Sequence, residues 1–322
     1  MTSEHSNTQL AAVLWVTLST GLFSLTFVSG RLAPPEVMAL HILFLRYIGG
    51  FAVVGTLVAM RRQPVGRTRP ARVATHALRT MCGASGGICA IEAAARMPIA
   101  DATAIGMLDG LLIVLLGIVL LREVVSGRHW LAIAVSIVGG AVVVAGRGAF
   151  AELDAAYAVP AGLAFAGAVL IALESILIRV LAVSEPLLNV LFFVNLFGML
   201  LLAGPALATW PDIGAAGPGG ADPAILGFLI LGPISISGQY CTLRGYRLAP
   251  VSVVGPVGYS WIVFAALIGL IGFAELPTAT TVAGSVLIVA GGVMLARLPG
   301  TPAAAPLPLP AATDVAAAEA ET

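Results

Sequence analysis

The chain is a succession of long apolar segments, each about the length of a membrane-spanning helix and each separated from the next by a short loop. A helix needs about 20 consecutive apolar residues to cross the hydrocarbon core of a bilayer. Arginine clusters, prolines and Gly/Pro/Asp loops divide the sequence into ten such segments. The predicted spans are residues 10–30, 36–60, 72–95, 98–121, 127–146, 156–180, 186–209, 223–246, 249–273 and 277–298.

The composition agrees with an all-α polytopic membrane protein. Hydrophobic residues make up 59% of the chain, charged residues make up 10%, and the mean hydropathy is +1.03. A soluble domain carries about 25% charged residues, and one of 322 residues could not hide this much apolar surface from water. The formal net charge is zero, so the charge balance does not suggest a nucleic-acid partner.

The two ends of the chain are expected to lie outside the bilayer. Residues 1–9 are polar and lack the basic region, short apolar run and cleavage site of a removable signal peptide. Residues 299–322 are rich in proline and alanine and low in bulky side chains, which predicts a disordered tail.

The arginines predict the orientation, because cytoplasmic loops carry an excess of basic residues. All sixteen basic residues are arginines, and eleven of them fall on one side of the predicted bundle. These eleven are Arg61, Arg62, Arg67, Arg69, Arg72, Arg122, Arg128, Arg179, Arg244, Arg247 and Arg297. The opposite side carries only Arg31, Arg96 and Arg147. Both termini are therefore predicted to be cytoplasmic in a protein of the inner (plasma) membrane.

A shift of 152 residues superimposes one half of the chain on the other. Pro98 then falls on Pro250, Gly106 falls on Gly258, and the glycine pair 139–140 falls on 291–292. Residues 10–148 and 149–298 therefore form two predicted repeats of five helices. Because five is odd, the second repeat must cross the membrane in the opposite sense. Inverted repeats are typical of transporters, whose substrate site lies near the bilayer midplane.

Several motifs carry a family resemblance over residues 10–298. They are "MPIADATAIGM…LLREVV", its second copy "APVSVVGPVGY…GFAELP", and the "FLRY" of the second span. With these motifs the chain resembles EamA-type members of the drug/metabolite transporter superfamily. The resemblance implies ten helices in two inverted halves and the carriage of small metabolites such as amino acids, without indicating one substrate.

Polar side chains near the middle of the spans are the candidate substrate ligands. A charge at the bilayer centre costs at least about 2.5–3.5 kcal/mol, so such residues are expected to face a partner or a water-filled cavity. The candidates are Arg46, Asp109, Asn195, Tyr259 and Trp261. Arg46 has the planar fork that binds a carboxylate, and Asp109 offers a carboxylate to an ammonium group. The alternative is that Arg46 and Asp109 neutralise each other as a structural or gating pair.

A second group consists of candidates for proton coupling or gating. Glu174 is expected either to carry a proton or to pair with Arg179. His76 and Arg79 share one arc of the third span with several small residues, and they are expected to line an inner vestibule or to bind lipid headgroups.

The remaining two candidates, Asp101 and Pro256, concern helix ends and kinks. Asp101 opens the fourth span, where a carboxylate either meets the helix dipole or forms a station at the outer mouth. Pro256 should kink the ninth span, and "VVGPVGYSW" is the best candidate for a broken helix that lines a cavity.

The function expected from these features is secondary transport of a small polar metabolite, such as an amino acid or an amine-bearing relative, by alternating access around a midplane site. The alternative is a flippase for lipids or lipid headgroups on the same architecture. No enzyme motif is visible, so we expect no catalysis, no cofactor and no metal site. The expected partners are a small-molecule substrate and the lipid bilayer, with no nucleic acid, in a monomer or homodimer.

Overall fold

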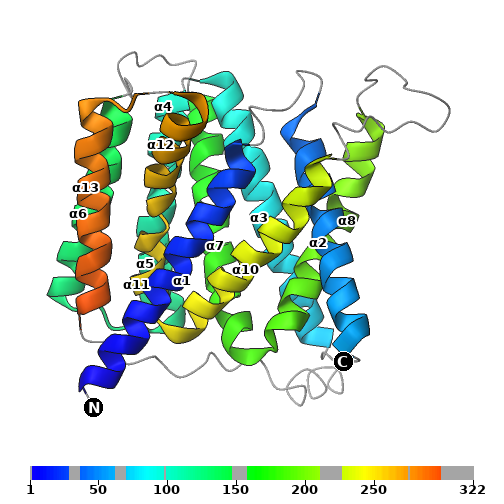
Figure 1. Ribbon diagram of the computed structural model, residues 1–322, viewed down its shortest axis with the longest axis horizontal. Coiled ribbons are helices and arrows are strands. Elements are labelled where there is room, and N and C mark those ends of the chain that lie inside the picture. Colours follow the sequence, from blue (N-terminus) through cyan, green and yellow to red (C-terminus); the bar gives the residue numbers. More distant parts are fainter. Residues whose placement is uncertain are drawn as a thin grey trace, which may run out of the picture.

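A computed structural model describes residues 2–28, 37–61, 70–97, 99–146, 158–210, 227–274 and 276–298, and every regular element in these ranges is a helix. The first half of the chain contains α1 (Thr2–Val28), α2 (Ala39–Arg61), α3 (Pro70–Arg96), α4 (Ile99–Gly106), α5 (Leu108–Leu121) and α6 (Gly127–Ala145). The second half contains α7 (Ala158–Ser184), α8 (Leu187–Ala208), the short 3-10 helix η3 (Phe228–Ile230), α10 (Leu231–Leu248), α11 (Val251–Val257), α12 (Ser260–Phe273) and α13 (Ala279–Arg297). The helices stand side by side between an upper and a lower edge (Figure 1).

Each predicted span coincides with a helix or with two helices in line. The span predicted at 249–273 is broken between α11 and α12, two residues after Pro256, as the "VVGPVGYSW" pattern indicated. The span predicted at 98–121 is also broken, at Met107 between α4 and α5. That break was not predicted because no proline marks it. It falls one repeat length before Tyr259, so the 152-residue shift is the signal that would have found it.

Seven helices in the described ranges are long and apolar enough to cross a membrane. The three predicted spans that are not among them are α3, the α4–α5 pair and α10. Helix α5 is apolar but has only 14 residues, while α3 and α10 carry arginines and other polar side chains.

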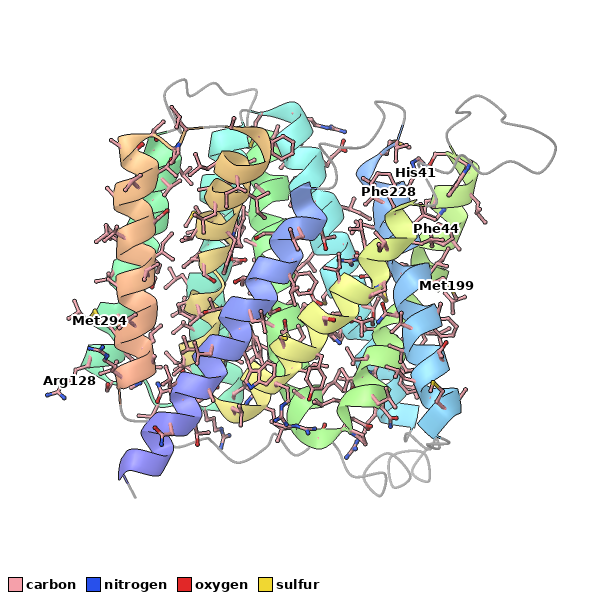
Figure 2. All side chains as sticks on the ribbon, viewed as in Figure 1. His41, Phe44, Arg128, Met199, Phe228 and Met294 are labelled. Carbon is pink, nitrogen blue, oxygen red and sulfur yellow. The ribbon has the colours of Figure 1, made fainter. Side chains whose placement is uncertain are left out.

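The surface of the bundle is apolar, as a multi-pass membrane protein requires. Bulky side chains point outward from several helices, and Val119, Ile271 and Val159 are 71%, 83% and 66% exposed. Apolar side chains, drawn mostly as carbon, point outward along the flanks of the bundle, while Arg128 extends outward at the lower edge (Figure 2). This distribution fits a protein that meets lipid along its flanks and water at its edges.

Long contacts join helices from the two halves of the chain. Helix α6 packs along α13, α3 packs along α7, and α1 packs along α10. Glycines allow these close approaches: a Cβ atom added at Gly139 would lie 2.7 Å from the carbonyl oxygen of Gly284, and one added at Gly86 would lie 3.2 Å from that of Gly167. Small residues at helix contacts are the usual means of close packing in membranes.

Candidate functional site

The centre of the bundle contains an ion pair between Arg79 of α3 and Glu174 of α7. The Arg79 Nε atom lies 3.7 Å from Glu174 Oε1, and the two side chains are 4% and 24% exposed. Each residue lies within about 6 Å of the middle of its helix at a rise of 1.5 Å per residue. Burying an isolated charge at this depth costs at least about 2.5–3.5 kcal/mol, so the pair reduces a cost that either residue alone would impose.

Helix α3 approaches the Glu174 carboxylate at a glycine. A Cβ atom added at Gly83 would lie 2.5–2.7 Å from the carboxylate atoms of Glu174, which is closer than real Cβ contacts. Gly83 stands one turn after Arg79 on the same face of α3, because residues four apart are neighbours on a helix. A glycine is therefore required here for the carboxylate to reach Arg79.

Arg46 of α2 does not pair with Asp109. Both side chains are in the described part of the chain, where no ion pair joins them. The Arg46 guanidinium lies 4.7 Å from the centre of the Tyr47 ring. The structural-pair alternative for Arg46 and Asp109 is therefore wrong in this conformation, because the described contact of Arg46 is with its neighbour Tyr47.

Glu174 does not pair with Arg179 either. These residues are five positions apart, which places their side chains about 140° apart around α7. Arg179 Nη1 instead donates a hydrogen bond to the carbonyl oxygen of Tyr246 on α10. That expectation of the sequence is also wrong, since the partner of Glu174 comes from another helix.

His76 lies one turn before Arg79 on α3 and is completely buried. Its ring stacks on Phe193 of α8, with ring centres 4.8 Å apart and planes 26° apart. Neither ring nitrogen has a hydrogen-bond partner among the described residues. His76 therefore faces α8 inside the bundle, away from the surface where it would meet lipid headgroups.

Asn195 of α8 belongs to a neutral polar chain beside this group. Its Nδ2 atom donates to the carbonyl oxygen of Leu191 at 2.7 Å and to Gln239 Oε1 at 3.2 Å. The Gln239 side chain in turn donates to Ser235 Oγ at 3.3 Å, within α10. The Asn195 Oδ1 atom has no described donor and lies against Gly50 of α2. These hydrogen bonds link α8 to α10. Asn195 therefore lies at the contact between these two helices.

Asp109 and Tyr259 lie at the two helix breaks. Asp109 is in the first turn of α5 and is half-buried. The Tyr259 hydroxyl donates to the carbonyl oxygen of Met107 and lies against Gly110. The hydrogen bond from Tyr259 joins the break in one half of the chain to the break in the other.

Trp261, Pro256 and Asp101 occupy different environments. Trp261 is 36% exposed on α12, and its carbonyl oxygen accepts a hydrogen bond from the Ser24 hydroxyl at 3.4 Å. Pro256 is buried within α11. Asp101 is the third residue of α4, and its side chain lies outside the described part of the structure.

A second set of contacts fastens the lower edge of the bundle. Glu123, only 6% exposed, follows α5 and accepts hydrogen bonds from the backbone N–H groups of Val251 at 2.8 Å and Ser252 at 2.9 Å. A carboxylate at the first N–H groups of a helix satisfies donors that have no partner within that helix. These hydrogen bonds join the end of α5 in the first half of the chain to the start of α11 in the second half.

The start of α3 and the ends of α7 and α10 meet at the same edge. Arg72 Nη1 forms an ion pair with Glu185 Oε1 at 2.9 Å and also donates to the carbonyl oxygen of Ser184. Arg247 donates to the carbonyl oxygens of Ala182 and Glu185, both at 2.6 Å. The Arg72 and Glu123 contacts join the two halves of the chain at the lower edge, while the Arg247 contacts join α10 to the end of α7 within the second half.

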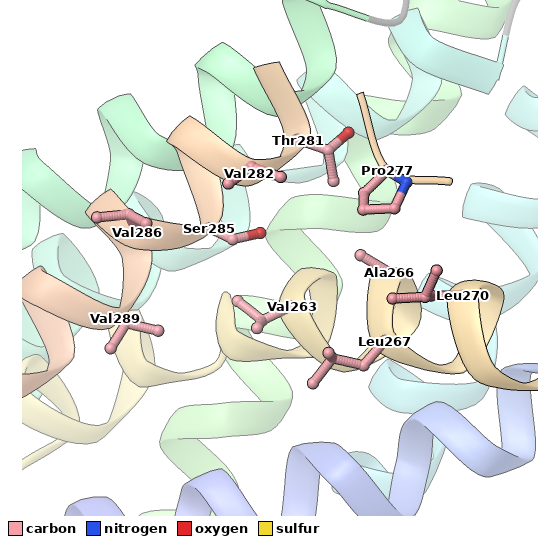
Figure 3. A pocket seen from close by; sticks show the side chains of 10 residues that line it. All are labelled: Val263, Ala266, Leu267, Leu270, Pro277, Thr281, Val282, Ser285, Val286 and Val289. Carbon is pink, nitrogen blue, oxygen red and sulfur yellow. The ribbon is translucent and has the colours of Figure 1, made fainter. Parts of the chain in front are cut away.

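An apolar groove lies away from all these charges, between α12 and α13 (Figure 3). It encloses about 310 Å³, and its walls include Leu267, Leu270, Val282 and Val286, with Thr281 and Ser285 as the polar members. The four apolar residues named are also partly exposed on the flank of the bundle. The groove therefore suits hydrocarbon and offers no charge to a polar solute.

The comparisons with known proteins agree with this architecture. The profile of the EamA-like transporter family matches residues 10–145 and 160–297, which is most of the chain. The chain belongs to the EamA-like transporter family. Its two matched segments correspond to the two halves of the EamA-like bundle, and the protein is accordingly a multi-pass membrane transporter.

Individual relatives cover almost the whole chain. The Pseudopaline exporter CntI of Pseudomonas aeruginosa, in strains UCBPP-PA14 and PAO1, is 28% identical over 295 residues, which is 89% of this chain and 96% of the relative. A crystal structure of a protein 23% identical in sequence superimposes with a TM-score of 0.71 and covers 90% of this chain and 98% of its own. That superposition shows a shared fold for this EamA-like protein.

Proposed function

We propose that this protein is a secondary transporter of the inner (plasma) membrane that carries a small polar metabolite by alternating access. The observation that carries the proposal is the buried ion pair of Arg79 and Glu174 near the middle of α3 and α7. A structural membrane protein has no need of such a costly group, whereas a carrier needs polar contacts at mid-depth.

The proposed architecture has ten spans in two inverted repeats of five. Its support is the pattern of contacts between the halves: α3 packs on α7, and the repeat equivalents of this pair, α10 and α1, also pack together. Helix α6 packs on its own repeat equivalent, α13. Gly139 contacts Gly284 and Gly146 contacts Thr280, so residue numbers rise along one helix as they fall along the other, and the two helices run antiparallel. A pseudo-two-fold axis in the membrane plane would produce this pattern.

The proposed conformation is closed at the lower edge and open towards the upper edge. Glu123 and Arg72 join the halves at the lower edge. On the arc of α3 that carries Arg79, a Cβ atom added at Gly87 would meet no atom within 4 Å, and Ala90 is exposed. Under the positive-inside rule the arginines at the lower edge make that side cytoplasmic, so the open side would face outward with both termini inside.

The substrate class that we propose is amino acids or amine-bearing relatives. The Arg79 and Arg46 guanidinium groups suit an acidic group, and Asp109 beside Tyr259 suits an amine. The name of the relative, Pseudopaline exporter CntI, supports small-molecule export as the direction.

Transport by the purified full-length protein in sealed liposomes tests this proposal. We expect radiolabelled amino acids to accumulate or to exchange across liposomes that contain the protein, and empty liposomes to show only leakage. Absence of protein-dependent movement for all amino acids, amines and their oligomers would contradict it.

A lipid flippase is the second candidate, favoured by the apolar groove between α12 and α13. Liposomes that contain a fluorescent phospholipid distinguish the two functions. In empty liposomes, dithionite quenches only the dye on lipids of the outer leaflet. If the protein allows dithionite to quench the inner-leaflet dye as well, and no solute moves, the flippase function would be favoured.

A further inference from the structure

The buried arginine of the central ion pair is short of hydrogen-bond acceptors. Arg79 is 3% exposed, and its Nε and Nη1 atoms have no hydrogen-bond partner in the described protein. The nearest carboxylate oxygen lies 3.7 Å from Nε, whereas a charge-assisted hydrogen bond between such groups spans about 2.7–2.9 Å. Glu174 therefore offsets the charge of Arg79 without filling its planar fork.

The neighbouring groups increase this shortage. At a similar depth on α2, Arg46 Nε is also buried without a hydrogen-bond partner among the described residues. Both ring nitrogens of His76, one turn away on α3, are buried and unpartnered as well. The described part of the site therefore has more donors than acceptors.

We propose that Arg79, together with Arg46, binds a carboxylate group of the transported solute. This inference rests on the proposed function and names the recognition site within it. The unpartnered nitrogens of Arg79 and Arg46 need acceptors, and the planar fork of arginine matches the two oxygens of a carboxylate. Asp109 and Tyr259 lie at the helix breaks, so they contact a different part of the solute.

A solute is a better source of this carboxylate or similar anion than a lipid headgroup. Arg46, Arg79 and Glu174 all lie within about 6 Å of the middle of their helices, whereas headgroups lie about 15 Å from the centre of the bilayer. The open arc of α3 at Gly87 and Ala90 leads towards this depth from the upper edge.

Glu174 then acts as an internal competitor for Arg79. Its carboxylate rests against Gly83 in the absence of solute, and the solute carboxylate replaces it on the guanidinium. The solute carboxylate then offsets the charge of Arg79 in place of Glu174. Removal of the Glu174 charge should therefore strengthen the binding of a carboxylate, although it breaks an ion pair.

The test is a thermal-shift titration of the purified full-length protein with pairs of L-amino acids and their C-terminal amides, such as leucine and leucinamide. Ligand binding raises the unfolding temperature by mass action. The variants are Arg79→Gln, Arg79→Lys and Glu174→Gln, with Arg96→Gln as the matched control. Arg96 is on the same helix, exposed, and paired with Glu92. A double variant, Arg79→Gln with Glu174→Gln, removes both charges if the single Arg79 variant does not fold.

We expect at least one acid to stabilise the protein more than its amide does. Arg79→Gln and Arg79→Lys should weaken that binding at least tenfold, Glu174→Gln should tighten it several-fold, and Arg96→Gln should leave it unchanged. Equal binding of acids and amides, no binding by any acid, or unchanged binding in the Arg79 variants or in the double variant would overturn the proposal.

Two further arms separate this inference from its alternatives. Acid binding that persists in phosphatidylcholine nanodiscs and is lost in phosphatidylglycerol nanodiscs would assign the site to lipid headgroups and overturn the proposal. Liposome transport of amines that lack a carboxylate, without transport of acids, would leave the proposed function intact and overturn the inference. Acid-selective binding without any transport would uphold the site and contradict the proposed function.

Discussion

Single residues decide the character of the central group, and Gly83 shows how. Arg79 and Glu174 come from different helices, and they meet only because α3 has no side chain at position 83. Among the described glycines some have the opposite surroundings: a Cβ atom added at Gly55 of α2 would meet nothing within 4 Å. The same substitution at the two positions therefore has different physical consequences.

The prediction at this scale compares Gly83→Ala with Gly55→Ala. Gly83→Ala displaces the Glu174 carboxylate from Arg79, so it should lower the unfolding temperature by several degrees and reduce transport at least fivefold. Gly55→Ala should leave transport unchanged and stability unchanged or higher, because alanine favours a helix over glycine by about 1 kcal/mol. Measurement of melting curves and initial transport rates in both variants checks this. Equal effects at the two glycines would mean that position 83 has no special contact with Glu174.

At the scale of helices, the broken spans and the Glu123 contact belong together. The α11 segment is short, carries Pro256, and begins at two N–H groups that bond to Glu123 from the other half of the chain. Two residues after its other end, the Tyr259 hydroxyl donates a hydrogen bond to the carbonyl oxygen of Met107 in the first half. Both ends of this short helix are thus attached to the α4–α5 region across the contact between the halves.

The prediction for this element is that Glu123→Ala weakens the attachment at the lower edge. Loss of a carboxylate that accepts two helix N–H groups should lower the free energy of unfolding by about 1–2 kcal/mol. Glu92→Ala is the control, because Glu92 is a partly exposed carboxylate that pairs with Arg96 of its own helix. Thermal unfolding of both variants under matched conditions gives the comparison. If Glu92→Ala lowers the free energy of unfolding by the same amount, the effect comes from removing a carboxylate charge and not from the contact of Glu123 with α11.

At the scale of the whole molecule, the question is which edge faces the cytoplasm. Arg128 is the second residue of α6 and extends outward at the lower edge (Figure 2). Arg96 is the last residue of α3, which ends at the upper edge (Figure 1). The excess of arginine at the lower edge predicts that this edge is inside. The two positions therefore report opposite sides of the membrane.

The prediction is tested by labelling single cysteines in intact cells. In a variant without Cys82, Cys89 and Cys241, a membrane-impermeant maleimide should label Arg96→Cys from outside and should label Arg128→Cys only after the cells are opened. The transport assay confirms that both variants remain folded. Labelling of Arg128→Cys in intact cells would reverse the proposed orientation.

The sequence by itself determined the elements of this protein. The lengths of the apolar segments predicted the helices to within a few residues for most spans, because the thickness of a bilayer sets a helix length. Pro256 predicted a broken helix, because proline removes a backbone donor. The family resemblance was also confirmed, since it depends on these local patterns.

Only the tertiary structure decided which polar groups meet. The sequence suggested Arg46 with Asp109 and Glu174 with Arg179, whereas the structure pairs Glu174 with Arg79 and brings Glu123 to the start of α11. Helical periodicity tells which residues share a face and roughly how deep they lie. It does not tell which helix stands opposite that face. That choice depends on the packing of all the helices, through glycine contacts such as Gly139 with Gly284, between residues far apart in the chain.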